Sequence, residues 1–212
     1  MDDIKTEYYL SLDVSTTNVG IALWDKETGT LLELKHLSLK INRKDVDPEY
    51  RDLIKSDLFE EYFIEYKKYV ESELDGVISK VIIEAPLPNT KVNINTTALL
   101  LGFNGMARRI LYQIFETKPI KLSVHDSRKN FLPEFVKRKK KRDGSIETTL
   151  SFPKGWKANE KKRFIWEKVS KLEPEIEWFY KKNSDEPKDI CFDMSDAYCV
   201  GYAQLKIDEI IQ

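Results

Sequence analysis

The order of apolar segments constrains the fold of this chain more than any other feature. Three strand-like runs come first, over 8–13, 19–24 and 31–40. Only short segments with turn-forming residues separate them, such as Lys-Glu-Thr-Gly-Thr at 26–30. Strands that follow one another so closely pair antiparallel, so this part of the chain is predicted to form a three-stranded meander.

Helical and strand-like patterns alternate after the meander. Apolar residues at helical spacing over 53–74 precede a β-branched run at 80–84, and a second helix over 96–116 precedes a strand at 120–124. Strands joined through helices pair in parallel. The predicted fold is therefore α/β: a mixed five-stranded sheet with helices on both faces. A short helix is expected near Arg128, and two longer helices over 156–172 and 193–212 complete the chain.

The 212 residues suit one sizeable domain, and we predict a single domain over 1–212 with a basic insert at about 137–155. The part of the insert from 137 to 153 is expected to be a flexible loop. With 41% hydrophobic and 33% charged residues, the composition is typical of a globular protein. No apolar run reaches the length of about 18 residues that a membrane helix needs, and no signal peptide is evident, so a cytoplasmic location is expected.

The two cysteines, Cys191 and Cys199, lie in an apolar stretch and are expected to be buried free thiols. No Cys-x-x-Cys pair or histidine cluster accompanies them, which excludes the common zinc-binding patterns.

The near-neutral net charge of −1 conceals an uneven distribution. Residues 121–168 hold 15 Lys and Arg but only 6 Asp and Glu, a surplus of nine positive charges. The remainder of the chain therefore carries ten net negative charges. A protein divided in this way can offer a basic surface to phosphates and keep an acidic site for a metal, although a solvated helix and loop would give the same count.

Four acidic residues stand where metal chemistry would need them. Asp13 ends the first strand and Glu84 ends the fourth, so parallel pairing of these strands would bring both carboxylates to one edge of the sheet. Asp193 and Asp196 are three residues apart on the last helix and share a face. Carboxylate oxygens suit Mg²⁺, with Mn²⁺ as a substitute. Two such ions, roughly 3.5–4 Å apart, can hydrolyse a phosphodiester.

Each of these acids also has a structural explanation. Asp13 can end a strand in a turn, and Asp193 can cap the last helix or complement its dipole. Glu84 follows Val-Ile-Ile, and an acid in such an apolar segment is costly unless its charge is paired. Asp196 lies on a helix that is otherwise expected to be buried, where a carboxylate needs a ligand or partner. The set of four is therefore more specific than any one member.

At these residues the chain resembles the RuvC-type Holliday-junction resolvases. The segment 13–22, Asp-Val-Ser-Thr-Thr-Asn-Val-Gly-Ile-Ala, resembles their first motif. Ile83-Glu84, followed by Asn93, Thr97-Ala98-Leu99 and Leu101-Gly102, resembles the second. The closing Asp-x-x-Asp-Ala corresponds to 193–197, and the segment with Ala158, Lys161 and Lys162 resembles the lysine-bearing stretch before it.

This resemblance covers the chain from about residue 8 to 203. It implies an RNase H-like fold, a homodimer, dependence on Mg²⁺, and paired symmetric nicks across a four-way DNA junction. By motif, Asp13, Glu84, Asp193 and Asp196 would be the metal-binding catalytic acids. The loop after Glu84 is longer than in the bacterial enzymes and lacks their early phenylalanine. Together with the insert at 137–153, this resembles a phage- or virus-type member.

Basic residues near the acids are predicted to bind DNA. They are Arg128, Lys129, Lys157, Lys161, Lys162 and Arg163. The six consecutive cations at 137–142 are either further phosphate contacts or a solvated loop, and ordering on DNA would reconcile the two readings.

Rival functions remain at this stage. A nuclease that acts on other branched DNA or on RNA–DNA hybrids would use the same acids. The Asp-x-Ser-Thr start followed by Gly20 also resembles the phosphate loop of actin-like ATPases and sugar kinases. Those proteins need a second such half and a glycine-rich adenosine motif, and this chain has 8 Gly without such a cluster. An inactive junction-binding protein would be expected to lack one of the acids, and all four are present.

Overall fold

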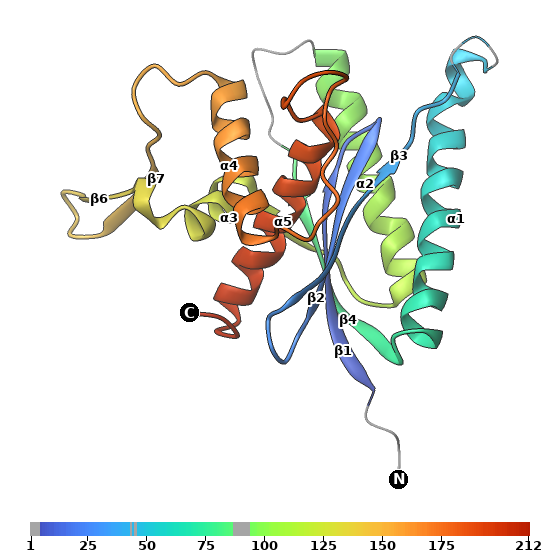
Figure 1. Cartoon of the computed structure of the whole chain (residues 1–212), viewed down its shortest axis with the longest axis horizontal. Coiled ribbons are helices and arrows are strands. Elements are labelled where there is room, and N and C mark those ends of the chain that lie inside the picture. Colours follow the sequence, from blue (N-terminus) through green and yellow to red (C-terminus); the bar gives the residue numbers. More distant parts are fainter. Residues whose placement is uncertain (1–4, 43, 45, 87–93) are drawn as a thin grey trace.

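Five strands form one mixed sheet in the order β3-β2-β1-β4-β5. The computed structural model (Figure 1) describes residues 5–42, 44, 46–86 and 94–212. β1 pairs antiparallel with β2 and parallel with β4, and β5 continues the parallel half. The strands are β1 (Thr6–Val14), β2 (Asn18–Asp25), β3 (Leu31–Ser38), β4 (Gly76–Ala85) and β5 (Ile120–Ser123). The predicted mixed five-stranded sheet with helices on both faces is confirmed.

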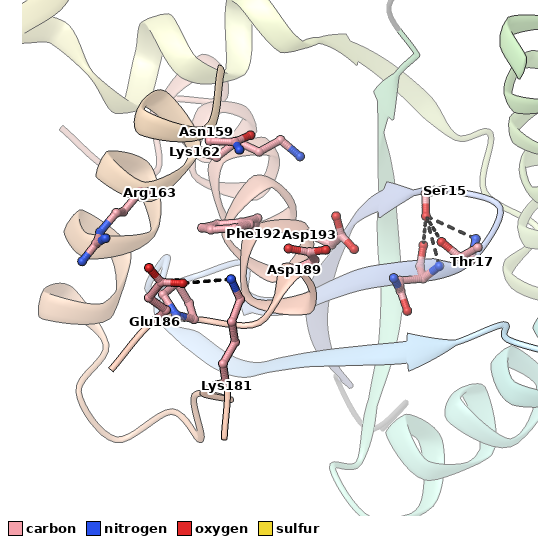
Figure 2. A pocket seen from close by; sticks show the side chains of 12 residues that line it. Ser15, Thr17, Asn159, Lys162, Arg163, Lys181, Glu186, Asp189, Phe192 and Asp193 are labelled. Carbon is pink, nitrogen blue, oxygen red and sulfur yellow. Dashed lines mark hydrogen bonds and ion pairs between the residues drawn. The ribbon is translucent and has the colours of Figure 1, made fainter. Parts of the chain in front are cut away.

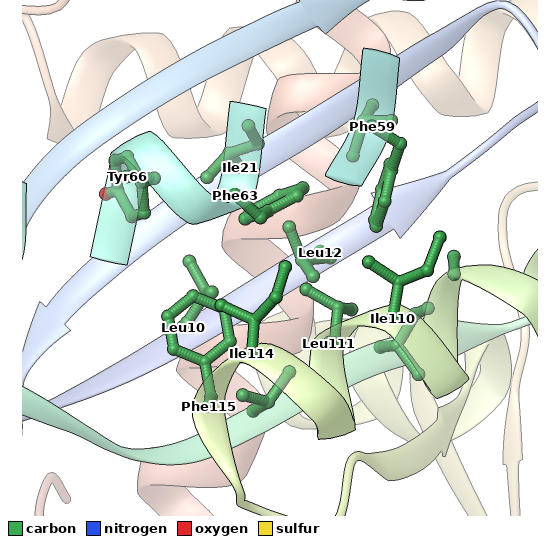
Figure 3. Packing of buried hydrophobic residues seen from close by; sticks show 14 of the residues in the cluster. Leu10, Leu12, Ile21, Phe59, Phe63, Tyr66, Ile110, Leu111, Ile114 and Phe115 are labelled. Carbon is green, nitrogen blue, oxygen red and sulfur yellow. The ribbon is translucent and has the colours of Figure 1, made fainter. Parts of the chain in front are cut away.

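One face of the sheet is covered by α1 (Arg51–Ser72) and α2 (Ile94–Phe115). Because side chains alternate along a strand, every second residue of β1 points to this face, including the fully buried Leu10 and Leu12. Figure 3 shows them packed against Phe63 and Leu111 from the two helices. Each fully buried apolar side chain of this kind contributes roughly 1.5–3 kcal/mol, so this face anchors the sheet.

The opposite face is covered by α5 (Asp189–Ile207), with α3 (Val124–Phe131) and α4 (Ala158–Leu172) beside it. Here α5 approaches the sheet closely, because Ser11 of the sheet and Gly201 of the helix are small where they meet. The hydroxyl of Ser11 donates to the Ala197 carbonyl at 2.9 Å and accepts from the indole of Trp24 at 3.0 Å. A methyl group added at Gly201 would lie 2.0 Å from Trp24 Nε1, so α5 needs glycine at this crossing.

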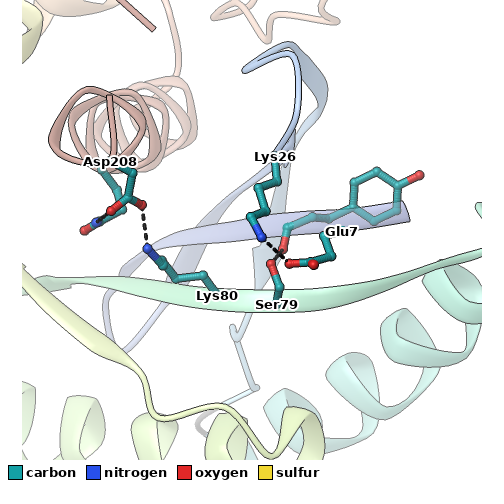
Figure 4. A network of polar contacts seen from close by, with 7 residues as sticks. Glu7, Lys26, Ser79, Lys80 and Asp208 are labelled. Atoms are coloured by element: carbon teal, nitrogen blue, oxygen red, sulfur yellow. Dashed lines mark hydrogen bonds and ion pairs between the residues drawn. The ribbon is translucent and has the colours of Figure 1, made fainter. Parts of the chain in front are cut away.

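The far end of α5 is fastened to the sheet by a polar network (Figure 4). The Lys80 ammonium on β4 donates to the carboxylate of Asp208, just beyond the end of the helix, and lies 4.7 Å from the centre of the Tyr9 ring. Lys26 and Glu7 form a second ion pair at 2.6 Å nearby. Contacts at the middle of α5 and just beyond its end thus fix its position along the strands.

Two sequence predictions of local structure were wrong. The segment 137–153 was expected to be a flexible loop, but β6 (Val136–Lys140) and β7 (Ile146–Leu150) pair as an antiparallel hairpin. The last helix begins at Asp189 rather than at Asp193, so Asp193 is its fifth residue. Two 3-10 turns, η1 (Pro48–Tyr50) and η2 (Pro133–Phe135), complete the elements of the described residues.

Both cysteines are free and buried, as predicted. Within the described residues, none of the helices is long and apolar enough to cross a membrane. Asn93, which belongs to the second sequence motif, lies outside the residues that the structure describes.

Candidate metal centre

Strand geometry brings Asp13 and Glu84 to the same edge and the same face of the sheet. The neighbouring strands β1 and β4 run parallel, with Leu12 opposite Ile83, so the next residues of both strands are the two acids. Asp13 shares its face of β1 with Ser11, and Glu84 shares its face of β4 with Lys80. Ser11 and Lys80 both contact α5 or the residue just after it, so both acids point to the α5 side of the sheet.

The helix α5 supplies the remaining acids. It passes directly over Gly20 of β2, where an added Cβ atom would lie 2.0 Å from the Asp193 carbonyl oxygen. This close approach lowers Asp196 into the edge of the sheet, where its side chain is only 5% exposed. Carboxylate oxygens of Asp13, Glu84 and Asp196 all lie within 4.8 Å of one another. Three residues that span more than 180 positions of the sequence thus form a group that could hold a metal ion.

Burial and mutual repulsion perturb this group strongly. Burial raises the pKa of Asp13 well above its usual range, and the carboxylates of Asp196 and Asp193 raise it further. Burial likewise raises the pKa of Glu84, with Asp13 and Asp196 adding to the shift. Glu84 Oε1 is buried without a hydrogen-bond donor. A buried carboxylate oxygen with no donor, among other carboxylates, fits a divalent cation as its partner.

Among the predicted DNA-binding residues, Arg128 has its charged group buried against the acid cluster. Its side chain extends from α3 and donates from an Nη atom to Asp196 at 2.8 Å, with only 16% of the side chain exposed. Burial disfavours the guanidinium charge, but Asp196 and Glu84 more than offset this and raise the pKa of Arg128. Arg128 therefore supplies positive charge to the acid cluster, and its placement argues against a direct contact with DNA.

Asp193 stands one turn before Asp196 and outside the group of three. Burial raises its pKa to about 6, opposed by Lys162 and by a hydrogen bond with the Asn18 side chain. Because α5 begins four residues earlier, the interpretation of Asp193 as a helix cap is wrong. Its carboxylate lies instead where the acid cluster meets a neighbouring pocket.

A pocket of about 580 Å³ adjoins the cluster (Figure 2). On one side it is bounded by the β1–β2 turn, where the Ser15 hydroxyl accepts from the backbone amides of Thr17 and Asn18. On the other side Lys162 reaches from α4 toward the part of α5 that carries Asp193. The pocket is lined by Ser15, Thr17, Asn18, Asn159, Lys162, Arg163, Lys181, Glu186, Pro187, Asp189, Phe192 and Asp193.

The other predicted DNA-binding residues lie around this pocket or on the adjoining surface. Arg163 lines the pocket and pairs with Glu167 at 3.0 Å. Lys161 places its ammonium 5.4 Å from the centre of the Phe152 ring, and Lys157 is the exposed N-cap residue of α4. Lys129 pairs with Asp126 on its own helix at 2.9 Å. The structure thus brings Lys162 and Arg163 to the pocket and leaves Lys129 on α3.

Two features of the site escaped sequence analysis. Arg128 and Asp196 are 68 positions apart in the sequence, and no local sequence pattern predicts that they pair. Gly20 belongs to the first motif, but its role as the platform for α5 depends on a helix that begins much later in the chain. The polar side chain of Asn18, in the same motif, was an available signal for a contact with Asp193.

The comparisons with known proteins bear on the fold. No protein-family model matches the sequence, and neither does any curated protein. Among solved structures, T. thermophilus RuvC in complex with a Holliday junction substrate has a TM-score of 0.56 at 8% identity, over 95% of each chain. A second structure of Thermus thermophilus RuvC gives a TM-score of 0.48 at 10% identity, over 94% of this chain and 96% of that one.

The yeast mitochondrial Holliday junction resolvase Ydc2 gives a TM-score of 0.49 at 12% identity, over 97% of this chain and 82% of its own. At such identities a likeness establishes the fold alone. On the first of these comparisons, the chain has the RuvC-like, RNase H-like fold that its motifs imply.

Proposed function

We propose that this protein is a metal-dependent endonuclease that cuts branched DNA, with the four-way junction as its substrate. The observation that carries the proposal is the convergence of Asp13, Glu84 and Asp196 at one edge of an RNase H-like sheet. A pocket with cationic side chains opens beside them. The likeness in fold to a RuvC that was solved with a Holliday junction supports the choice of substrate.

Asp13, Glu84 and Asp196 would hold the metal, with Asp193 as a further ligand when two ions are bound. Oxygen ligands alone favour Mg²⁺, and Mn²⁺ would substitute. When bound, such ions activate water and stabilise the leaving oxygen of a phosphodiester. The buried, unpartnered oxygen of Glu84 supports this assignment.

The other polar residues bind and position. Lys162 lies between the pocket and the acids and would hold the phosphate of the strand to be cut. Arg128 keeps the carboxylate of Asp196 in place and balances part of its charge. Lys157, Lys161, Arg163 and Lys129 would contact neighbouring phosphates, which position the DNA without reading its sequence. A phage- or virus-type member acting in the cytoplasm remains part of the proposal.

Paired symmetric nicks need two active sites, so the proposal includes a homodimer. The outward face of α2 supports one. It carries an apolar stripe of Ile94, Ala98, Leu101 and Tyr112, and Ile94 is 80% exposed. Gly105 lies within the stripe with no atom within 4 Å of its Cβ position, which would let a second helix approach closely. We call these five residues the α2 stripe.

The dimer is tested with Leu101→Glu. We expect it to sediment as a monomer and to turn paired junction cuts into single nicks. Leu53→Glu on α1 is the matched control, because Leu53 is also an exposed leucine but lies outside the α2 stripe. If both variants remain dimers, the α2 stripe is not the interface.

The activity is tested by offering synthetic substrates with Mg²⁺: a four-way junction, a fork, a flap, a plain duplex and an RNA–DNA hybrid. We expect symmetric paired nicks on the junction. Cutting confined to the hybrid would overturn the junction assignment. Glu84→Gln is expected to lower the cutting rate by at least about 100-fold, since a lost charge-stabilising group typically costs that much, while junction binding persists. Undiminished cutting by this variant would remove Glu84 from the site.

A further inference from the structure

The hairpin β6–β7 is a defined ribbon that stands apart from the main sheet. Its tip is closed by a backbone hydrogen bond from Lys141 to Ser145 at 2.8 Å, and Gly144 adopts a φ of 85° that favours glycine. Asp143 accepts from the amide and hydroxyl of Ser145. Figure 1 shows the ribbon projecting away from the helices, beyond α3. Each strand has five residues, so the ribbon is about 17 Å long.

Aromatic packing holds the base of the ribbon against α4. Phe135 before β6 and Phe152 after β7 lie 5.1 Å apart between ring centres, and both contact Trp156. Phe164 of α4 packs against Phe135 at 5.3 Å. A further backbone hydrogen bond, from Ser151 to Phe135 at 2.8 Å, continues the strand pairing into this cluster. The ribbon therefore leaves the body in a direction that α4 sets.

Both faces of the ribbon carry cations, and they differ in whether an acid accompanies them. Register pairs Arg138 with Thr148 and Lys140 with Ile146, so these four residues share one face, which we call the Arg138 face. It holds two cations and no acid, and Ile146 is 67% exposed. The opposite face also holds two cations, Lys137 and Lys139, but Lys139 is paired across the ribbon with Glu147, which forms an ion pair with Lys141 at 3.6 Å. The cations of that face are therefore partly neutralised, whereas those of the Arg138 face are not.

Cations link this ribbon to the acid cluster. Lys161 of α4 lies over the ring of Phe152 at the base of the ribbon. Its neighbour Lys162 lines the pocket beside Asp193. One DNA molecule with a strand at the acids would thus meet positive charge from the pocket to the ribbon base.

We propose that the Arg138 face enters the major groove of a B-form duplex arm of the bound DNA. A two-stranded ribbon has the width that this groove admits. Arg138 and Lys140 would contact phosphates along the groove, and Ile146 would meet the apolar methyl groups of thymine. This inference rests on the proposed function only in taking the duplex to be an arm of the cleaved substrate.

Two double variants with the same change in charge test the inference. Arg138→Ala with Lys140→Ala alters the Arg138 face, and Lys137→Ala with Lys139→Ala alters the opposite face. Both are made in the Glu84→Gln protein, and binding to a four-way junction and to a plain duplex is measured over a salt series. We expect the first pair to reduce the slope of log affinity against log salt by about 1.8, because each phosphate contact contributes about 0.9. The second pair should change it by less than half as much.

A duplex RNA of the same sequence separates groove entry from general attraction. The major groove of A-form RNA is too narrow for side chains to read, so the two double variants should bind this RNA equally well. Hydroxyl-radical footprints on DNA should lose protection along one arm with the first double variant alone.

Several results would overturn the inference. Equal losses from the two double variants would mean diffuse charge attraction, and unchanged binding would mean that the ribbon does not contact DNA. If the variants aggregate, the role of these cations is to keep the ribbon's open edges from pairing with other chains. If the unmodified protein cuts none of the substrates while the footprint difference persists, the proposed function fails and the ribbon assignment stands. If the protein cuts the junction but the footprints do not differ, the proposed function stands and the ribbon assignment fails.

Discussion

At the scale of single residues, Arg128 changes how the acid cluster is understood. The sequence suggested a cation for DNA, whereas the guanidinium is buried against Asp196 and near Glu84. A buried cation of this kind reduces the repulsion among the carboxylates while no metal is present. It also orients the carboxylate that a metal would need, because one oxygen of Asp196 accepts from the Arg128 guanidinium and the other is left for a metal.

Replacing Arg128 with methionine tests that role. Loss of one partner from a buried ion pair typically costs roughly 3–5 kcal/mol, so we expect a large fall in the free energy of unfolding of the metal-free protein. Arg163→Met is the matched control, because the Arg163–Glu167 pair is exposed and is worth at most about 1 kcal/mol. Denaturant unfolding of both variants measures the difference. Equal stability of the two would show that Arg128 does not neutralise the cluster.

At the scale of elements, the site depends on how closely α5 lies on β2. The helix crosses the strand where Gly20 offers no side chain, and this crossing sets the height of Asp193 and Asp196 above the sheet. A strand-end acid such as Asp13 could reach the same edge in many α/β folds. Only a helix seated this deeply adds a third carboxylate within 4.8 Å.

Gly20→Ala on β2 should therefore push α5 away from the sheet and disrupt the acid cluster. The added methyl group would meet the Asp193 carbonyl at 2.0 Å, and overpacking of this kind costs about 1–3 kcal/mol or more. We expect a lower melting temperature and a loss of cutting. Gly102→Ala on α2 adds the same methyl group into open space and should raise stability by up to about 1 kcal/mol, with cutting retained. Equal effects of the two substitutions would contradict the close crossing.

The elements also mark where sequence reasoning succeeds and where it stops. Asp13 and Glu84 could be placed because strand alternation and parallel pairing are local rules with a global consequence. The start of α5 was misplaced by four residues because Lys188, Asp189 and Ile190 have no strong capping pattern. The hairpin was missed because its cations hide the alternation of Val136, Ile146 and Leu150, and its stability comes from an aromatic cluster assembled from separate segments.

At the scale of the whole molecule, folding concentrates like charges that the extended chain keeps apart. Burial raises the pKa of Asp13 and Glu84 and raises the pKa of Asp193 to about 6. A carboxyl group with a raised pKa in the folded state contributes stability below its ordinary pKa. That contribution is lost as the pH rises through the raised value. Without metal, the acid cluster therefore opposes folding at neutral pH, and a bound cation would relieve it.

Asp193→Asn tests how much one of these carboxylates destabilises the folded, metal-free protein. In a chelator and above pH 6, the variant should be more stable than the unmodified protein by up to about 3 kcal/mol, at about 1.4 kcal/mol per pKa unit. The advantage should shrink as the pH falls from 6 to below 3.8, where the carboxyl becomes protonated in both states. Added Mg²⁺ should raise the melting temperature of the unmodified protein more than that of the variant, because binding to the folded state alone stabilises it. Chemical unfolding at a series of pH values, with and without Mg²⁺, provides the measurement. A stability difference that does not vary with pH would mean that Asp193 is not part of the charged cluster, and an equal response to Mg²⁺ would remove it from the metal ligands.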